Sequence, residues 1–212
     1  METCVIFCAG EFDSPAEPIA SGDYLIAADG GLTHLNRLNL TPHAIIGDFD
    51  SLGHTPDGAM VFPVEKDDTD SMLAIRHGLA LGYRRFLLYG ALDGPRLDHT
   101  IANLQSLQYL ADHHAQGFLV GMNQIATVIK NGSLRFPANA EGIVSAFCMG
   151  SDAQGVTIRG LKYTLENGIL SASFPLGVSN HFVGENSEIS VQNGSLLVIF
   201  QRNNPLPEVM PC

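Results

Sequence analysis

Two aspartates one residue apart, Asp48 and Asp50, directly follow a short apolar run at residues 44–46. If that run is a buried strand, both carboxylates lie at its C-terminal end, where open α/β sheets bind their ligands. Alternate residues of an extended chain point to the same side, so the two carboxylates are placed to hold one hard cation through oxygen. A capped surface turn is the alternative, because Asp and Gly are common in turns. The position of further acids along the chain favours a site.

The other acids of the first half also stand where expected strands end and expected helices begin: Asp29, Asp67, Asp68, Asp70, Asp93 and Asp98. Asp29 precedes Gly30-Gly31, which permits a close approach of the backbone before the next helix. In a parallel sheet, strand C-termini and helix N-termini share one rim, so we expect these separate turns to converge. Helix capping is the alternative for Asp68, Asp70 or Asp98 taken singly. Helix capping does not explain why all of these acids stand at such positions.

Such a rim needs a cation if it is to bind phosphate. Two unit charges ~4 Å apart interact by about 4 kcal/mol at a surface-like dielectric, so several carboxylates repel each other and a phosphate strongly. Mg²⁺ is the natural candidate, because it prefers oxygen ligands and often uses one or two carboxylates alongside substrate phosphates. Lys66 and Arg96 could meet phosphate oxygens directly, Arg96 as a bidentate fork. Solvated surface charge is the alternative for both.

The composition bounds the class of protein. The 212 residues are 45% hydrophobic and 16% charged, which is typical of a globular protein with a sizeable core. Acids outnumber bases 22 to 11, giving a formal net charge of -11 that argues against nucleic-acid binding. No apolar stretch reaches the ~20 residues that span a bilayer. With no basic leader and no Cys-x-x-Cys spacing among the four cysteines, we expect a cytoplasmic protein with reduced thiols.

Residues 1–124 show the pattern of an α/β domain. Apolar runs alternate with helical periodicity; the runs are residues 5–8, 24–28, 44–46, 86–89 and 118–120. Unbroken apolar runs of this kind are typical of parallel strands buried on both faces. Thr69 and Asp98 are the expected N-caps of the second and third helices. We therefore predict a Rossmann-like, mostly parallel sheet, without the Gly-x-Gly-x-x-Gly or Gly-Lys-Ser/Thr turns of common nucleotide folds.

Residues 125–212 follow a different pattern. Asn-Gly pairs at 131–132, 167–168 and 193–194 are flanked by strand-like sequence, and Asn-Gly is a strong signal for a tight hairpin turn. No long helix is expected here. The second half is therefore predicted to be an antiparallel β-sandwich or barrel, forming a second domain beside the α/β domain of residues 1–124.

Taken together, several motifs resemble those of the thiamine pyrophosphokinase (thiamine diphosphokinase) family. The similarity covers most of the chain through Ala28-Asp29-Gly30-Gly31, Ile45-Ile46-Gly47-Asp48-Phe49-Asp50-Ser51, Lys66-Asp67-Asp68-Thr69-Asp70, Arg96-Leu97-Asp98-His99-Thr100-Ile101-Ala102-Asn103, Gly160-Leu161-Lys162-Tyr163 and Gly177-Val178-Ser179-Asn180. Each motif alone is weak, whereas the set in this order is specific. The resemblance implies a two-domain subunit, with an α/β catalytic domain and a C-terminal β domain that binds thiamine, working as a homodimer.

The resemblance also implies a reaction. In that family the hydroxyethyl oxygen of thiamine attacks the β-phosphorus of Mg-ATP, and thiamine diphosphate and AMP are formed. The implied catalytic residues are Asp48, Asp50, Asp70 and Asp98, the first three also holding Mg²⁺. The implied nucleotide-binding residues are Asp29, Gly30, Asp67, Arg96 and His99. Ser179 and Asn180 resemble residues that hydrogen-bond the thiamine aminopyrimidine at a site built across the dimer interface. Positioning and charge neutralisation would supply most of the catalysis.

One segment departs from the family pattern. The family loop usually reads Gly-Gly-Arg before Leu-Asp-His, whereas residues 90–96 read Gly-Ala-Leu-Asp-Gly-Pro-Arg and are one residue longer. Pro95 has no N–H to offer a phosphate, so the role of Arg96 stays open. His181 stands where many relatives carry an acid, and we assign it no role.

Two rival functions remain. An Asp-x-Asp sequence also occurs in metal-dependent phosphohydrolases and glycosyltransferases; the former usually have Thr or Val where Leu52 stands, and the latter are usually larger. A non-enzymatic sensor of thiamine or nucleotide is the other rival, although a binder of cationic thiamine would not need five acids on a phosphate rim. Formation of AMP in step with a diphosphorylated thiamine distinguishes the kinase from both.

Overall fold

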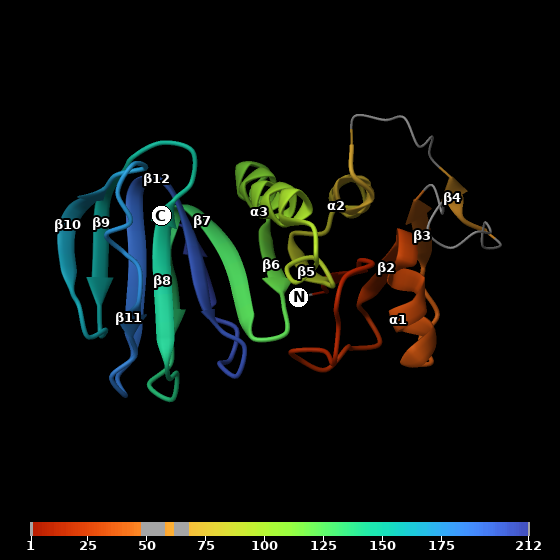
Figure 1. The fold of residues 1–212 in the computed structure, drawn as a ribbon, viewed down its shortest axis with the longest axis horizontal. Helices are drawn as coiled ribbons and strands as arrows, with labels where there is room; N and C mark the ends of the chain where they lie inside the picture. Colours follow the sequence, from red (N-terminus) through yellow and green to blue (C-terminus); the bar gives the residue numbers. More distant parts are fainter. Residues whose placement is uncertain (1, 48–57, 62–67, 212) are drawn as a thin grey trace. The chain divides into compact units, whose positions relative to one another are not determined.

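The computed structural model describes residues 2–47, 58–61 and 68–211, and the chain divides into two compact units (Figure 1). Unit 1 comprises Met1–Ser106 and Gly117–Met122, and unit 2 comprises Leu107–Gln116 and Asn123–Cys212. The domain bounds expected from the sequence, 1–124 and 125–212, stay a prediction.

Unit 1 is built on a sheet in the strand order β6-β5-β1-β2-β3-β4. Its strands are β1 (Cys4–Phe7), β2 (Tyr24–Ala28), β3 (Ala44–Gly47), β4 (Met60–Val61), β5 (Arg85–Tyr89) and β6 (Gln116–Val120). β1 pairs in parallel with both β2 and β5, and β3 pairs in parallel with β2 and β4. All four residues of β1 are buried, as its unbroken apolar sequence predicts for a strand covered on both faces.

The helices of unit 1 connect these parallel strands. They are the 3-10 turn η1 (Asp29–Gly31), α1 (Leu32–Arg37), α2 (Asp70–Ala80) and the first part of α3 (Leu97–Asp112), whose residues from Leu107 on belong to unit 2. Figure 1 shows α2 and the beginning of α3 on the same side of the sheet, apart from α1. Thr69 caps α2 as predicted, because its Oγ1 accepts a hydrogen bond from the Met72 backbone N–H at 3.3 Å. The predicted cap at Asp98 is wrong: α3 begins at Leu97, so Asp98 lies inside its first turn.

Unit 2 is an antiparallel β structure, as expected. Its strands are β7 (Gln124–Phe136), β8 (Ile143–Cys148), β9 (Ala153–Arg159), β10 (Leu165–Leu170), β11 (Asn180–His181), β12 (Ser187–Gln201) and β13 (Glu208–Pro211). The long strand β12 pairs with β7 along most of its length. On its other edge β12 pairs first with β9 and, after the Asn193-Gly194 irregularity, with β8. This change of partner brings two layers of strands over one core, which includes Val144, Val156 and Phe200.

The predicted Asn-Gly hairpins are wrong. Asn131-Gly132 lies inside β7, Asn167-Gly168 inside β10 and Asn193-Gly194 inside β12. The β7–β12 register shifts between Val191 and Ser195, and Asn131 Oδ1 accepts a hydrogen bond from the Gly194 N–H at 3.0 Å. One type of β-bulge, the G1 bulge, has the same positive φ that an Asn-Gly turn tolerates, and Asn131, Asn167 and Gly194 have positive φ. The dipeptide alone therefore does not distinguish a bulge from a turn.

Within the described residues, no helix is both long and apolar enough to cross a membrane.

Candidate active site

The loops that follow β1 and β5 run side by side at the carboxyl end of the sheet. The Cys8 N–H donates to the Tyr89 carbonyl oxygen at 2.8 Å, and the Gly10 N–H donates to the Gly90 carbonyl oxygen at 2.9 Å. A Cβ at Gly10 would lie 2.5 Å from that same oxygen, so only glycine permits this contact. The two loops therefore form one continuous backbone surface beyond the strands.

The turn that carries Asp29 is wedged against the ends of two strands. Asp29 has a positive φ of 49°, which is uncommon outside glycine. A Cβ at Gly31 would lie 1.8 Å from the Phe7 carbonyl oxygen, and one at Gly47 would lie 3.1 Å from the Asp29 Cα. The end of β3 therefore lies against Asp29, immediately before the sequence position of Asp48.

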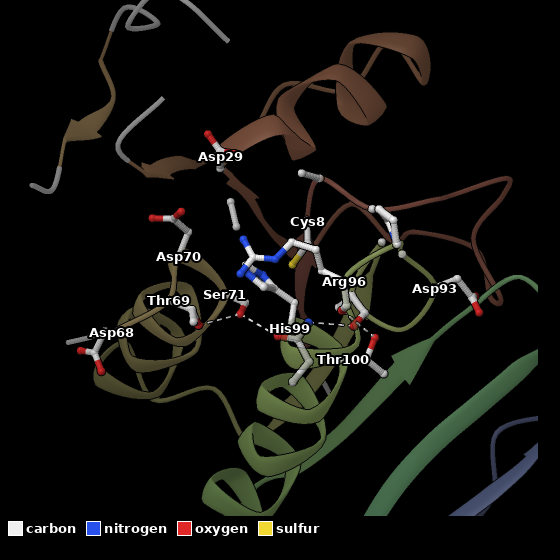
Figure 2. Close-up of a pocket in the computed structure, with 18 residues that line it drawn as sticks. Cys8, Asp29, Asp68, Thr69, Asp70, Ser71, Asp93, Arg96, His99 and Thr100 are labelled. Atoms are coloured by element: carbon white, nitrogen blue, oxygen red, sulfur yellow. Dashed lines mark hydrogen bonds between the residues drawn. The ribbon is translucent and has the colours of Figure 1, made fainter. Parts of the chain in front are cut away.

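A cavity of about 600 Å³ opens at this edge of unit 1 (Figure 2). Its lining comes from the ends of β1, β2 and β5 and from the starts of α2 and α3, as expected for an open α/β sheet. The lining residues are Cys8, Ala9, Gly10, Ala28, Asp29, Asp68, Thr69, Asp70, Ser71, Gly90, Ala91, Asp93, Gly94, Pro95, Arg96, His99, Thr100 and Asn103.

Two of the predicted acids, Asp29 and Asp70, both influence the thiol of Cys8, which lines the cavity. Burial raises the pKa of the Cys8 thiol to about 12, and the negative charges of Asp70 and Asp29 both add to that rise. The two carboxylates, which come from separate elements, are therefore close enough to influence one sulfur atom. Figure 2 shows them on the same side of the cavity. The convergence of these two turns is the arrangement that the sequence predicts.

Asp68 and Asp93 also line the cavity, but their carboxylates are held by other groups. Asp68 Oδ2 accepts a hydrogen bond from Arg76 at 2.5 Å in an exposed ion pair. The Asp93 carboxylate accepts a hydrogen bond from the Met122 backbone N–H. Figure 2 shows both side chains pointing away from Asp29 and Asp70. Of these four acids, Asp29 and Asp70 are the two whose charges act on Cys8.

Arg96 and Asp98 form an ion pair at the start of α3. The Arg96 guanidinium donates to Asp98 at 2.6 and 3.2 Å, and this hydrogen bonding lowers the pKa of Asp98 to about 2. The same contact raises the pKa of Arg96 above its usual value. Arg96 and His99 line the cavity, whereas Asp98 and Gly30 do not. The Asp98 side chain is 66% exposed, so the pair is screened by solvent.

Two buried hydrogen bonds in the wall of the cavity were not expected from the sequence. Ser71 donates to Asn103 Oδ1 at 2.8 Å, and Asn103 Nδ2 donates to the Ala91 carbonyl oxygen at 2.7 Å. Both side chains are buried, each 9% exposed. The signal that could have revealed them is the occurrence of polar residues at core-facing positions of two otherwise amphipathic helices.

Ser179 and Asn180, the predicted thiamine-binding residues, belong to unit 2. Ser179 has a positive φ of 58°, and its backbone N–H donates to Ser145 Oγ at 3.0 Å. Asn180 is buried; its Oδ1 accepts from the backbone N–H groups of Tyr163 and His181, both at 2.9 Å, and its Nδ2 donates to the Tyr163 carbonyl oxygen at 2.6 Å. The Asn180 amide therefore holds the backbone of Tyr163 in place.

Three predicted site residues, Asp48, Asp50 and Asp67, lie outside the described residues, as does Lys66. Of the three predicted Mg²⁺ ligands, Asp48, Asp50 and Asp70, only Asp70 is among the described residues. Among the described residues, no group of three or more His, Cys, Asp and Glu side chains is arranged to hold a metal ion.

Comparison with known proteins identifies the family. The model "Thiamin pyrophosphokinase, catalytic domain" matches residues 15–119, and "Thiamin pyrophosphokinase, vitamin B1 binding domain" matches residues 133–198. Thiamin pyrophosphokinase 1 of Caenorhabditis elegans is 26% identical over 190 residues, covering 82% of this chain and 77% of that protein.

Two crystal structures are similar over nearly the whole chain. Thiamine pyrophosphokinase from Bacillus subtilis superposes with a TM-score of 0.81 at 22% identity, covering 94% of this chain and 99% of that one, and this likeness shows the fold. Thiamin pyrophosphokinase from Geobacillus thermodenitrificans has a TM-score of 0.76 at 26% identity, with coverage of 95% and 97%. Both units, the two family models and these relatives agree: the chain belongs to the thiamin pyrophosphokinase family.

Proposed function

We propose that this protein transfers the diphosphoryl group of ATP to thiamine. A bond forms between the hydroxyethyl oxygen of thiamine and the β-phosphorus of ATP, and the bond from that phosphorus to the oxygen bridging it to the α-phosphorus breaks. AMP leaves with the bridging oxygen, and the hydroxyl proton is released. The observation that carries the proposal is the convergence of Asp29 and Asp70 at one cavity of a unit matched by the family's catalytic-domain model.

The chemistry of the cavity suits a polyphosphate bound with a cation. Arg96 supplies a guanidinium to the lining, and a guanidinium pairs with phosphate oxygens in a bidentate fork. The same guanidinium also donates a hydrogen bond to Asp98. His99 and the backbone of residues 90–94 supply further polar groups. Carboxylates at the same cavity would repel the phosphates unless a divalent ion neutralised them.

The donor set fits Mg²⁺. Carboxylate oxygen is its preferred protein ligand, Asp70 lies at the cavity, and β3 delivers Gly47 against Asp29 directly before Asp48. In our proposal Asp48, Asp50 and Asp70 hold the ion, with Asp29 and Asp67 nearby. When bound, Mg²⁺ supplies charge neutralisation to the phosphates. These residues would hold the ion and the nucleotide tail in place, and Arg96 would supply positive charge to the phosphates.

We place the thiamine site at Ser179 and Asn180 in unit 2. The positive φ of Ser179 is a strained backbone conformation, and such conformations cluster at ligand sites. Because Asn180 Oδ1 already accepts two backbone hydrogen bonds, Asn180 would act on the ligand largely by holding Tyr163. Tyr163 is 59% exposed, which leaves its ring available to contact a ligand.

We further propose that the protein works as a homodimer. Several large apolar side chains of unit 2 are about half exposed or more; they are Tyr163, Ile169, Phe174, Leu176, Val178 and Val183. An apolar surface of this kind is typical of a protein–protein interface. Sedimentation analysis of the wild type and of Phe174→Ser tests this, and a wild type that stays monomeric at micromolar concentration would contradict it.

Incubation with thiamine, ATP and Mg²⁺, followed by chromatography, tests the proposed reaction. We expect AMP and thiamine diphosphate in equal amounts, with no AMP when thiamine or Mg²⁺ is omitted. Asp48→Asn and Asp50→Asn should abolish turnover while leaving the circular dichroism spectrum unchanged. Asp13→Asn removes an exposed charge of unit 1 that does not line the cavity, so it serves as the control.

Other product patterns would favour the rival functions. Release of phosphate or diphosphate from ATP without dependence on thiamine would indicate a phosphohydrolase. Saturable binding of thiamine or ATP with no product would indicate a sensor. Formation of ADP with thiamine monophosphate would show transfer of a single phosphoryl group and would overturn the proposed cleavage site.

A further inference from the structure

Four hydrogen bonds form a directed chain in the wall of the cavity. The Met72 backbone N–H can only donate, and it donates to Thr69 Oγ1 at 3.3 Å. Thr69 Oγ1 and Ser71 Oγ are 3.0 Å apart, Ser71 donates to Asn103 Oδ1 at 2.8 Å, and Asn103 Nδ2 donates to the Ala91 carbonyl oxygen at 2.7 Å. Because Ser71 donates to Asn103, it is Thr69 that donates to Ser71. The donor and the acceptor of each bond therefore follow from the two ends of the chain, where the Met72 N–H can only donate and the Ala91 carbonyl oxygen can only accept.

This chain connects the two sides of the cavity that carry opposite charge. The first side chain of this series, Thr69, directly precedes Asp70 and caps α2. Its last member, the Ala91 carbonyl group, lies in the loop of residues 90–96 that ends at Arg96. A second bond supports the same loop, because Thr100 Oγ1 donates to the Leu92 carbonyl oxygen at 3.3 Å. Along the polypeptide, these two sides are separated by the whole of α2 and β5.

The energetics favour a fixed geometry. Ser71 and Asn103 are each 9% exposed, and their mutual hydrogen bond is buried. Leaving a buried polar group without its partner is unfavourable, so the chain resists separation of its members. Hydrogen bonds aligned in series also polarise one another. Movement of the Ala91 loop relative to α2 would break at least one bond of the chain.

We propose that Asn103 is a positioning residue that sets the separation of Asp70 and Arg96 across the cavity. Its amide oxygen is tied to α2 through Ser71, and its amide nitrogen is tied to the Arg96 loop through Ala91. A side-chain amide suits this role because its oxygen accepts on one side while its nitrogen donates on the other. The inference rests on the proposed function, in which Asp70 and Arg96 engage the ion and the phosphates.

Ser71→Ala and Ser106→Ala provide a matched test. Both substitutions delete one buried hydroxyl, since Ser71 is 9% and Ser106 1% exposed. Ser106 Oγ donates to the Asn103 backbone carbonyl within α3 at 2.6 Å and does not reach α2 or the loop. We expect Ser71→Ala to lower kcat/KM for ATP by about tenfold, and Ser106→Ala by less than about twofold, at comparable losses of Tm.

Two further variants separate positioning from simple destabilisation. Ser71→Thr keeps the hydroxyl and should restore most of the lost kcat/KM. Asn103→Ala should lower kcat/KM by at least as much as Ser71→Ala, and the double variant should add little to it, because both changes break the same chain. Equal losses in Ser71→Ala and Ser106→Ala, or additive effects in the double variant, would overturn the proposal.

Hydrogen exchange supplies a readout that does not depend on activity. In the full-length protein, Ser71→Ala should raise deuterium uptake at residues 91–96, although the deleted hydroxyl is on α2, and Ser106→Ala should not. Unchanged uptake in Ser71→Ala would overturn the coupling. If the wild type forms no AMP from ATP and thiamine, the proposed function fails, while the exchange comparison still decides whether Asn103 couples the two elements.

Discussion

The two units place polar side chains in different ways. In unit 1, Asp29 and Asp70 come from separate elements and act on one buried thiol at the base of a cavity. In unit 2, Ser179 and Asn180 are neighbours in sequence, and the Asn180 amide is used to hold the backbone of Tyr163. A parallel sheet gathers distant residues at one edge, whereas in the antiparallel unit the two predicted ligand-binding residues are adjacent and one of them holds the backbone of Tyr163. Substitutions should therefore affect chemistry in unit 1 and local structure in unit 2.

The largest effect is expected from Asp70→Asn. The change removes a negative charge from the cavity without altering its shape, so we expect kcat/KM to fall by about 100-fold or more with little change in Tm. Asp68→Asn is the matched control, because Asp68 lies two residues away but is paired with Arg76. The loss of kcat/KM in Asp68→Asn should stay below about tenfold. Steady-state kinetics measure both, and equal losses would show that convergence with Asp29 is not what matters.

A smaller effect, on stability, is expected in unit 2. Asn180→Ala deletes the hydrogen bonds to the Tyr163 backbone and should lower the free energy of unfolding by about 2 kcal/mol. It should also raise KM for thiamine far more than KM for ATP. Asn180→Asp keeps the acceptor and should lose less stability. Urea denaturation tests this; unchanged stability with a raised thiamine KM would show that Asn180 touches the ligand and does not act through Tyr163.

A pair of aspartates with the same structural role in each unit sharpens the comparison. Asp93 accepts a hydrogen bond from the Met122 backbone N–H in unit 1, and Asp152 accepts one from the Ala172 N–H at 2.8 Å in unit 2. Replacement of either by Ala should lower the free energy of unfolding by about 1 kcal/mol. Only Asp93→Ala should raise KM for ATP, because it releases the loop that carries Arg96. An equal effect of Asp152→Ala on that KM would contradict this.

The smallest effect concerns the exposed Arg96–Asp98 pair. The pKa of Asp98 is lowered from 3.8 to about 2, chiefly by the hydrogen bond from Arg96. A lowered carboxyl pKa means that the pair stabilises the fold above pH 3.8 and loses this contribution as the pH falls towards 2. Arg96→Gln should return the pKa towards 3.8, as measured by NMR of the carboxyl carbon. Arg159→Gln, which removes the exposed partner of Glu166 in unit 2, should leave it unchanged.

Much of unit 1 could be predicted from the sequence because strand and helix periodicity differ there so clearly. The predicted run 24–28 matches β2, and the Thr69 cap is correct. The convergence of Asp29 and Asp70 followed from topology alone. The Asp98 cap was wrong by two residues, because α3 begins at Leu97 and its N-cap position is Arg96. Helix ends are the least determined part of such a prediction.

Other features depend on contacts that periodicity does not encode. The Asn-Gly pairs of unit 2 occur at irregularities within strands. Whether such a pair forms a bulge or a turn depends on the strand that pairs with it, which the dipeptide does not encode. The partners of Asp68 and Asp93, Arg76 and Met122, are set by packing. The same holds for the bond between Ser71 and Asn103, whose positions in sequence are distant and whose spacing carries no motif.

The glycine contacts at the cavity have a consequence for protein engineering. Gly10 and Gly31 have no room for a methyl group, because a Cβ would lie 2.5 Å and 1.8 Å from carbonyl oxygens of neighbouring strands and loops. A mutagenesis library that varies these positions would consist mostly of proteins that do not fold. Diversity intended to alter nucleotide preference is better directed at His99, which lines the same cavity.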